Sequence, residues 1–304
     1  EYDIVVEQFR PGVMDRLGLG YEALRERNSR LIYCSLTGYG QYGSYSMRAG
    51  HDINYMALSG IESFSGRRDS GPSLHGIQFA DIAGGSKSLV IAVMAAAMRR
   101  ERTGEGDYCD ISITDCLFAL SAFDTAGFLA GGDLPSSETG ILNGGSLYDY
   151  YRTSDGRYLS VGVIEPKFLT AFMEAIGMAD ELDGGLLDSS QVAGLKKRIA
   201  KRIASHPLSH WIRAFKDIDA CVEPVIDLSE ALSSPPLSER DIIVTVRDEQ
   251  GAEYRQIGNP LKFASGNYVS KQAGSAPGRH NREILEELGY EKDAIDTLYS
   301  LKVM

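Results

Sequence analysis

The stretch LIYCSL at residues 31–36 decides the fold, because it has the apolar composition of a buried strand. An earlier run, IVV at residues 4–6, predicts a first strand, and residues 21–27 between the two predict a helix. Strands that are joined through a helix run parallel, since the crossover returns the chain to the same end of the sheet. The sequence therefore predicts an α/β fold with a parallel sheet.

Similar patterns continue this organisation along the chain. A helix around residues 53–60, a long apolar helix from residue 83 to about 102, a strand at 108–113 and a helix at 115–129 are expected. Six Gly or Pro residues in the loop 131–145 indicate a domain boundary. The elements expected after it are strands 148–151, 158–163 and 221–226, helices 167–176, 191–204 and 208–216, a hairpin at 242–257, and helices 282–288 and 294–301.

The composition is that of a globular protein with an acidic surface. The 304 residues are 43% hydrophobic and 24% charged, and the net charge is −11. Such a chain can bury a sizeable core, and its negative charge disfavours general nucleic-acid binding. An anionic ligand would need a local basic patch or a helix N-terminus.

The cysteines and the apolar runs favour a cytoplasmic protein. None of the four cysteines forms a C-x-x-C pair or lies near His at zinc-ligand spacing, so no metal site is expected and the thiols are predicted to be buried. The longest apolar run, residues 89–98, is too short to span a membrane. No signal peptide is expected, and the chain opens with Glu1 almost directly in a strand, which suggests that an N-terminal segment is missing.

The loop at residues 38–43 matches the pattern G-x-G-x-x-G. A dinucleotide site requires a strand before this pattern and a helix that opens within it. The strand is expected here, but residues 44–50 have the composition of a loop. We therefore interpret the stretch as a flexible glycine loop.

Three ionisable side chains stand at two expected helix starts. His51 and Asp52, in GHDINY at residues 50–55, are simplest as helix caps, but a histidine there could also act as a general base. Asp81, in DIAGGS at residues 81–86, could likewise be a cap. The two glycines after it are poor helix formers, which suggests that something must approach the backbone closely. A carboxylate beside free N–H groups could serve as a nucleophile or a proton carrier.

Three further charged side chains have simple structural interpretations. Arg10 and Arg16 follow the end of the first strand, where they could be solvated or could bind phosphate through the guanidinium. Glu165 precedes Pro166 and reads most simply as the start of a helix. None of these residues would decide a function alone.

Together the motifs resemble one known family. The matching stretches are residues 6–18, 31–40, 50–55, 106–112, 219–225 and 277–281, with Asp81 and its glycines. They resemble the family III CoA-transferases, which include the L-carnitine dehydratase/bile-acid-inducible protein F group and a racemase branch that acts on α-methylacyl-CoA. The resemblance covers essentially the whole chain.

The resemblance implies a particular domain arrangement. It implies a large Rossmann-like CoA-binding domain made of residues 1–135 and 250–304, a smaller α+β domain of residues 136–249, and an interlocked homodimer. Chains of this family begin with a further segment that helps to hold CoA, which agrees with the expectation of a missing N-terminal piece. The CoA thioester is the substrate, and no other cofactor and no metal are implied.

The resemblance also implies roles for individual residues. His51 and Asp81 match the proton-transferring pair of the racemases, and Asp52 and Glu165 match acidic partners. In the transferases the position of Asp81 is instead a nucleophile. The positions that match CoA- or substrate-binding residues are Gln8, Phe9, Arg10, Arg16, Gly50, Ile53, Asn54 and Tyr55.

Three functions follow from this resemblance. A racemase for 2-methylacyl-CoA is expected, because His51 suits a proton carrier and residues 143–146 match the glycine loop of the transferases poorly. The alternative is a CoA-transferase that works through Asp81. A CoA-binding protein without activity is the third. Branched fatty acyl, bile-acid, carnitine-type and small dicarboxylic acyl groups all remain open as substrates.

Overall fold

The structure is a computed structural model that describes residues 2–182, 189–266, 268 and 270–303. The chain folds into two compact units, residues 1–225 and 226–304. The predicted large domain combines residues 1–135 of the first unit with residues 250–304 of the second. This prediction therefore depends on how the two units associate. That assignment of domains therefore stays a prediction.

A parallel sheet organises the first unit, as the sequence predicted. Its strands are β1 (Ile4–Glu7), β2 (Ile32–Thr37) and β3 (Asp107–Ser112), with β2 in the centre. Both pairings are parallel, and Ile32 lies opposite Ile4 on one side and Asp107 on the other. The central strand is almost wholly buried, which explains its continuous apolar sequence.

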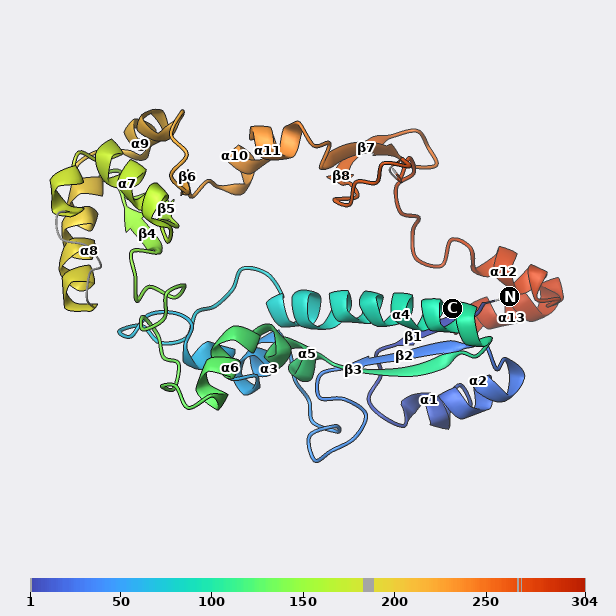
Figure 1. The fold of residues 1–304 in the computed structure, drawn as a ribbon. Helices are drawn as coiled ribbons and strands as arrows, with labels where there is room; N and C mark the ends of the chain where they lie inside the picture. Colours follow the sequence, from blue (N-terminus) through green and yellow to red (C-terminus); the bar gives the residue numbers. More distant parts are fainter. Residues whose placement is uncertain (1, 183–188, 267, 269, 304) are drawn as a thin grey trace. The chain divides into compact units, whose positions relative to one another are not determined.

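Helices cover both faces of this sheet (Figure 1). On one face α4 (Lys87–Thr103) packs Ala92, Val93 and Ala96 against Ile32 and Cys34. On the other face α2 (Tyr21–Arg27) follows α1 (Val13–Arg16), and the ring of its first residue stacks on that of Tyr108. Alternate residues of β2 thus serve the two layers, as the two-residue period of a strand requires.

The long helix starts differently from its prediction. It opens with a π-helical stretch, η2 (Ala80–Ser86), so Asp81 lies inside the helix and is not its cap. Gly84 and Gly85 are buried against α5 (Ile113–Leu120), and a Cβ on Gly85 would lie 2.9 Å from the Cγ1 of Ile113. What approaches these glycines is therefore a neighbouring helix. The end is as predicted, with Gly104 at φ +77°.

The stretch from η2 to the end of α4, Ala80–Thr103, is also long and apolar enough by composition to cross a membrane. It is longer than the uninterrupted apolar run 89–98, on which the expectation from the sequence rests. One face of α4 nevertheless packs against the sheet and belongs to the core between them. The expectation that the chain has no membrane span stays a prediction.

The predicted helix at residues 115–129 is two helices. The structure has α5 and then α6 (Ala122–Leu129), which meet at Ser121. The hydroxyl of Ser121 donates to the carbonyl of Phe118 at 2.7 Å and also contacts the hydroxyl of Thr125 at 2.8 Å. A serine that bonds to a carbonyl of the preceding turn competes with the helix, which accounts for the break.

Residues 147–224 form a second layered structure in the first unit. An antiparallel sheet of β4 (Asp149–Arg152), β5 (Tyr158–Val161) and β6 (Val222–Pro224) lies against helices and encloses a core around Trp211. The helices are α7 (Pro166–Ala175), η3 (Ala179–Leu182), α8 (Ser189–Ile203) and α9 (Leu208–Phe215). Cys221, predicted to be a buried strand residue, is exposed and precedes β6 with φ +50°.

The remaining predicted elements are present, together with three short helices of the described chain that were not predicted. The first unit also contains α3 (Asp52–Leu58) and η1 (Ile61–Ser63), both beside the site described below. In the second unit the predicted hairpin is β7 (Ile243–Arg247) paired with β8 (Glu253–Ile257). Its helices are α10 (Leu228–Ser233), α11 (Pro235–Ser238), α12 (Asn281–Glu287) and α13 (Lys292–Ser300).

Candidate active site

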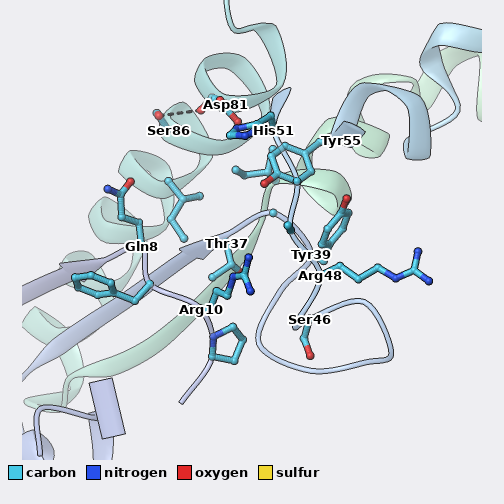
Figure 2. A pocket seen from close by; sticks show the side chains of 17 residues that line it. Gln8, Arg10, Thr37, Tyr39, Ser46, Arg48, His51, Tyr55, Asp81 and Ser86 are labelled. Atoms are coloured by element: carbon cyan, nitrogen blue, oxygen red, sulfur yellow. Dashed lines mark hydrogen bonds between the residues drawn. The ribbon is translucent and has the colours of Figure 1, made fainter. Parts of the chain in front are cut away.

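A cavity of about 450 Å³ lies where β1 and β2 end (Figure 2). The carboxyl ends of parallel strands are the usual place for a ligand in an α/β sheet, because the loops that follow them gather there. The walls come from the loop after β1, the end of β2, the loop before α3, and the start of the long helix. The lining residues are Gln8, Phe9, Arg10, Pro11, Leu36, Thr37, Gly38, Tyr39, Ser46, Arg48, Ala49, Gly50, His51, Tyr55, Asp81, Ser86 and Ile113.

His51 is placed by the start of α3. It is the residue before the helix, its N–H donates to the Oδ1 of Asn54 at 3.0 Å, and its carbonyl accepts from the N–H of Asn54 at 2.8 Å. These reciprocal bonds fix the backbone of His51, as in a capping box. The side chain reaches the cavity while the backbone begins the helix, so the position before α3 is compatible with a role as general base, which stays a prediction.

Two glycines make room for Tyr55 in the wall of the cavity. A Cβ on Gly38 would lie 2.2 Å from the ring of Tyr55, and one on Gly50 would lie 2.6 Å from it. Both positions therefore exclude any larger side chain as long as the ring stays there. Tyr55 also packs edge-on to Tyr39, with 5.2 Å between the ring centroids.

Asp81 enters the cavity from the π-helical stretch η2. Its N–H donates to the Oδ1 of Asp52 at 2.8 Å, and its carbonyl accepts from the hydroxyl of Ser86 at 2.9 Å. Burial and the negative charge of Asp52 raise the pKa of the Asp81 carboxyl, and the imidazole of His51 acts in the opposite direction. A carboxyl group whose pKa is raised towards neutrality is better suited to exchanging protons. Figure 2 shows Asp81 next to His51.

Two guanidinium groups give the cavity a basic side in an acidic chain. Arg10 comes from the loop after β1, and Arg48 comes from the loop before α3 (Figure 2). The guanidinium of Arg48 also stacks over Tyr45, 3.9 Å from the ring centroid. Forked, planar cations of this kind suit phosphate groups. The local charge therefore fits an anionic ligand, although the net charge of the chain is negative.

The cavity brings together seven of the twelve residues singled out in the sequence. They are Gln8, Phe9, Arg10, Gly50, His51, Tyr55 and Asp81. The other five are not among the described residues that line this cavity. Asp52 and Ile53 line a neighbouring cavity, and Asn54 caps α3. Arg16 ends α1, and Glu165 starts α7, as its simplest interpretation predicted. The roles of all twelve stay predictions.

Sequence reasoning missed Thr37, Tyr39, Arg48 and Ser86 as lining residues. The hydroxyl of Thr37 is buried and has no hydrogen-bond partner among the described residues. A buried hydroxyl without a partner is unusual and marks a place where a ligand could donate or accept. Its position at the end of a predicted parallel strand was the available signal.

The glycine loop itself behaves as predicted. After β2 the described residues 38–51 contain no helix, and the next one is α3. Gly40 and Gly43 have φ values of +80° and +90°, which only glycine adopts readily. Across the described part of the chain, no three His, Cys, Asp or Glu side chains are grouped closely enough to hold a metal ion. The expected absence of a metal stays a prediction.

Comparisons with known proteins place these features in a family. The sequence profile of CoA-transferase family III matches residues 1–281. The chain is 34% identical over 303 residues to the alpha-methylacyl-CoA racemase of Homo sapiens, covering 99% of this chain and 78% of that protein. It is 28% identical over 298 residues to the succinate–glutarate CoA-transferase of Agrobacterium fabrum, covering 94% and 72%.

The fold is also similar to a solved structure. A CaiB/BaiF family protein from Brucella suis superimposes with a TM-score of 0.78 at 25% identity, covering 94% of this chain and 75% of that one. The relatives are enzymes, and racemases and CoA-transferases, the two activities predicted from the sequence, both occur among them. The chain belongs to CoA-transferase family III, as its motifs indicated.

Proposed function

We propose that this protein is an acyl-CoA racemase that inverts the α-carbon of a 2-methylacyl-CoA. The observation that carries the proposal is the presence of His51 and Asp81 in one cavity. Racemisation needs a base on one face of the α-carbon and an acid on the other. The 34% identity to alpha-methylacyl-CoA racemase supports the same choice.

The two proton carriers would work in sequence. One of them takes the α-proton, and the electrons of the broken C–H bond move to the thioester oxygen to give an enolate. The other carrier then returns a proton to the opposite face, which restores the thioester with inverted configuration. For this exchange the pKa of Asp81, raised by burial and by Asp52, is a favourable feature.

The rest of the cavity has a place in this proposal. Arg10 and Arg48 would bind phosphate groups of CoA, with Gln8 and Phe9 beside them. Asp52 would act on Asp81, whose N–H it accepts. Arg16, Ile53, Asn54 and Glu165 remain candidate substrate or partner residues outside this cavity. No metal and no cofactor are required by the reaction.

Coenzyme A transfer is the second candidate. Asp81 reaches the cavity with its carboxyl group and could attack a thioester, and CoA-transferases are among the relatives. That reaction needs only one activated carboxylate. It gives His51 no role, which is why we favour racemisation.

Incubation of a 2-methylacyl-CoA with the protein in heavy water, without any carboxylic acid acceptor, tests the proposal. We expect mass spectrometry to show one deuterium at the α-carbon, together with loss of stereochemical purity. His51→Asn and Asp81→Asn should each lower the exchange by about a thousandfold. If deuterium does not enter, and CoA moves to an added carboxylic acid, the protein is a transferase.

We propose further that the protein is a homodimer. The face of α4 that points away from the sheet carries four exposed apolar side chains, namely Val90, Ile91, Met94 and Met98. A continuous apolar surface of this kind is characteristic of an interface. Sedimentation should give twice the mass of 33.1 kDa, and Met94→Glu should lower it towards that of a single chain. The interlocked arrangement and the cytoplasmic location stay predictions.

A further inference from the structure

A second cavity, of about 590 Å³, adjoins the site on the other side of His51. His51 lines both cavities, and Asp52, which accepts the N–H of Asp81, lines the second one. A thioester whose α-carbon lies between His51 and Asp81 could therefore extend into it. The lining residues are His51, Asp52, Ile53, Met56, Ala57, Glu62, Pro72, Ser73, Leu74, His75, Gly76, Ile77 and Gln78.

Most of its walls are apolar. Ile53 and Met56 contribute from α3, while Leu74 and Ile77 come from the segment that leads to η2. Leu74 is 84% exposed and Ile77 is 65% exposed. Exposed apolar side chains that gather beside reacting groups provide a surface for an apolar ligand.

One polar pair interrupts this apolar wall. The Nε2 of His75 lies 3.1 Å from the Oε1 of Glu62, whose side chain is only 10% exposed. The imidazole also stacks on Phe79, with 5.8 Å between the ring centroids. The buried carboxylate and the aromatic ring together fix the orientation of His75.

The orientation leaves one ring nitrogen available. With Nε2 directed at Glu62, the Nδ1 of His75 has no hydrogen-bond partner among the described residues. The Oε2 of Glu62 is likewise buried without a partner in the described chain. A buried carboxylate is costly unless it is paired, so the contact with His75 stabilises Glu62 and fixes the imidazole at the same time.

We infer that the second cavity binds the acyl group and that His75, held by Glu62, hydrogen-bonds to a hydroxyl group on it. The substrate class is then a 2-methylacyl-CoA with an apolar chain that carries a hydroxyl group. The inference rests on the proposed function. It goes beyond that function by naming the acyl group and two residues that select it.

Affinity measured by calorimetry tests the inference without any turnover. Two acyl-CoA esters of equal chain length, one plain and one hydroxylated, are compared. We expect the native protein to bind the hydroxylated ester about tenfold more tightly, as one hydrogen bond would provide. His75→Phe should remove this preference and leave the affinity for the plain ester within about twofold. Glu62→Gln should reduce the preference only partly.

Control variants distinguish a loss of the preference for the hydroxylated ester from a general loss of binding. His210→Phe changes a histidine that stacks on Trp211 outside both cavities, and it should keep the preference. Leu74→Asp, at an exposed position, should weaken the binding of both esters by about fivefold or more, since it places a charge on the apolar wall. Equal affinity of the native protein for the two esters would overturn the inference. Absence of deuterium exchange with both esters would overturn the proposed function instead.

Discussion

Two regions of the first unit differ in how they use their buried side chains. In residues 147–222 one cluster encloses Trp211, Phe172 and their neighbours, and its large members are fully buried. The region that carries the site, residues 31–117, has two smaller clusters instead. Four polar atoms buried there, in Thr37, Gln41, Glu62 and Arg100, lack partners among the described residues.

The comparison indicates that the region around Trp211 mainly provides stability, whereas the other region provides the candidate site. The region around Trp211 forms a closed apolar core. The indole N–H of Trp211 donates to the carbonyl of Ile203 at 2.9 Å. The region around Asp81 keeps unsatisfied polar groups and exposed apolar ones next to a cavity. Buried polar groups without partners cost stability, and a bound ligand could satisfy them.

The largest effect is expected at Asp81, where activity and stability should change in opposite directions. Asp81→Asn should lower α-proton exchange by about a thousandfold, because the side chain no longer carries a proton. Since the pKa of Asp81 is raised in the folded protein, native stability falls as pH rises through that pKa. The asparagine variant should therefore melt at a higher temperature than the native protein at pH 7.

Exchange assays and calorimetric melting between pH 3 and pH 8 measure both effects. The gain in melting temperature should vanish as pH falls below the ordinary range for aspartate, where the native carboxyl is also neutral. Asp133→Asn, at an exposed loop position, is the control and should change neither quantity. A variant with full activity would remove Asp81 from the mechanism.

The second effect is a loss of stability in the region around Trp211. Trp211→Ala should cost about 3–5 kcal/mol, because the side chain is fully buried and leaves a large cavity. Urea unfolding measures the loss. Ile53→Ala in the other region removes an exposed side chain and should cost no more than about 0.5 kcal/mol. Similar losses at the two positions would contradict the contrast between the regions.

A smaller effect is expected where the two regions meet. The carboxylate of Asp149 is 7% exposed and pairs with both Arg67 and Lys196. Burial opposes ionisation of this group, but the two cations prevail and lower its pKa below the ordinary value. Asp149→Asn should cost about 2 kcal/mol, less than for a fully buried pair, because Arg67 is 38% exposed.

The pH dependence of that loss has a definite sign. With a lowered pKa in the folded state, the stabilisation by Asp149 is present above the ordinary aspartate range and disappears as pH falls through the folded pKa. The native and Asp149→Asn proteins should therefore converge in stability at acidic pH. Glu138→Gln, which removes a more exposed partner of Arg67, should cost about 1 kcal/mol or less.

Much of the fold could be predicted because its elements are locally encoded. Residues 21–27 have the helical composition and form α2, and the apolar run at 31–36 forms the central strand one residue further along. Gly104 marked the end of α4 by its backbone preference. The π-helical start of the long helix could not be predicted, because it depends on how closely α5 approaches Gly84 and Gly85.

The site was predictable in part for the same reason. His51 and Asp81 are recognisable as chemistry-bearing groups at helix starts, and the structure places both in one cavity. The sequence could not show that Ile53 faces the neighbouring cavity and that Asn54 caps the helix. Those outcomes depend on which side of α3 each residue occupies relative to the loops around it.

The smallest expected effect sharpens the electrostatic side of the comparison. Asp52→Asn removes the negative charge that raises the pKa of Asp81 but keeps an oxygen that can accept the N–H of Asp81. The limb of the pH–rate profile governed by Asp81 should therefore move to lower pH, while the melting temperature changes little. Deuterium exchange measured as kcat/KM from pH 4 to pH 9 reports this limb. A limb that stays in place or moves to higher pH would show that the charge of Asp52 does not raise the pKa of Asp81.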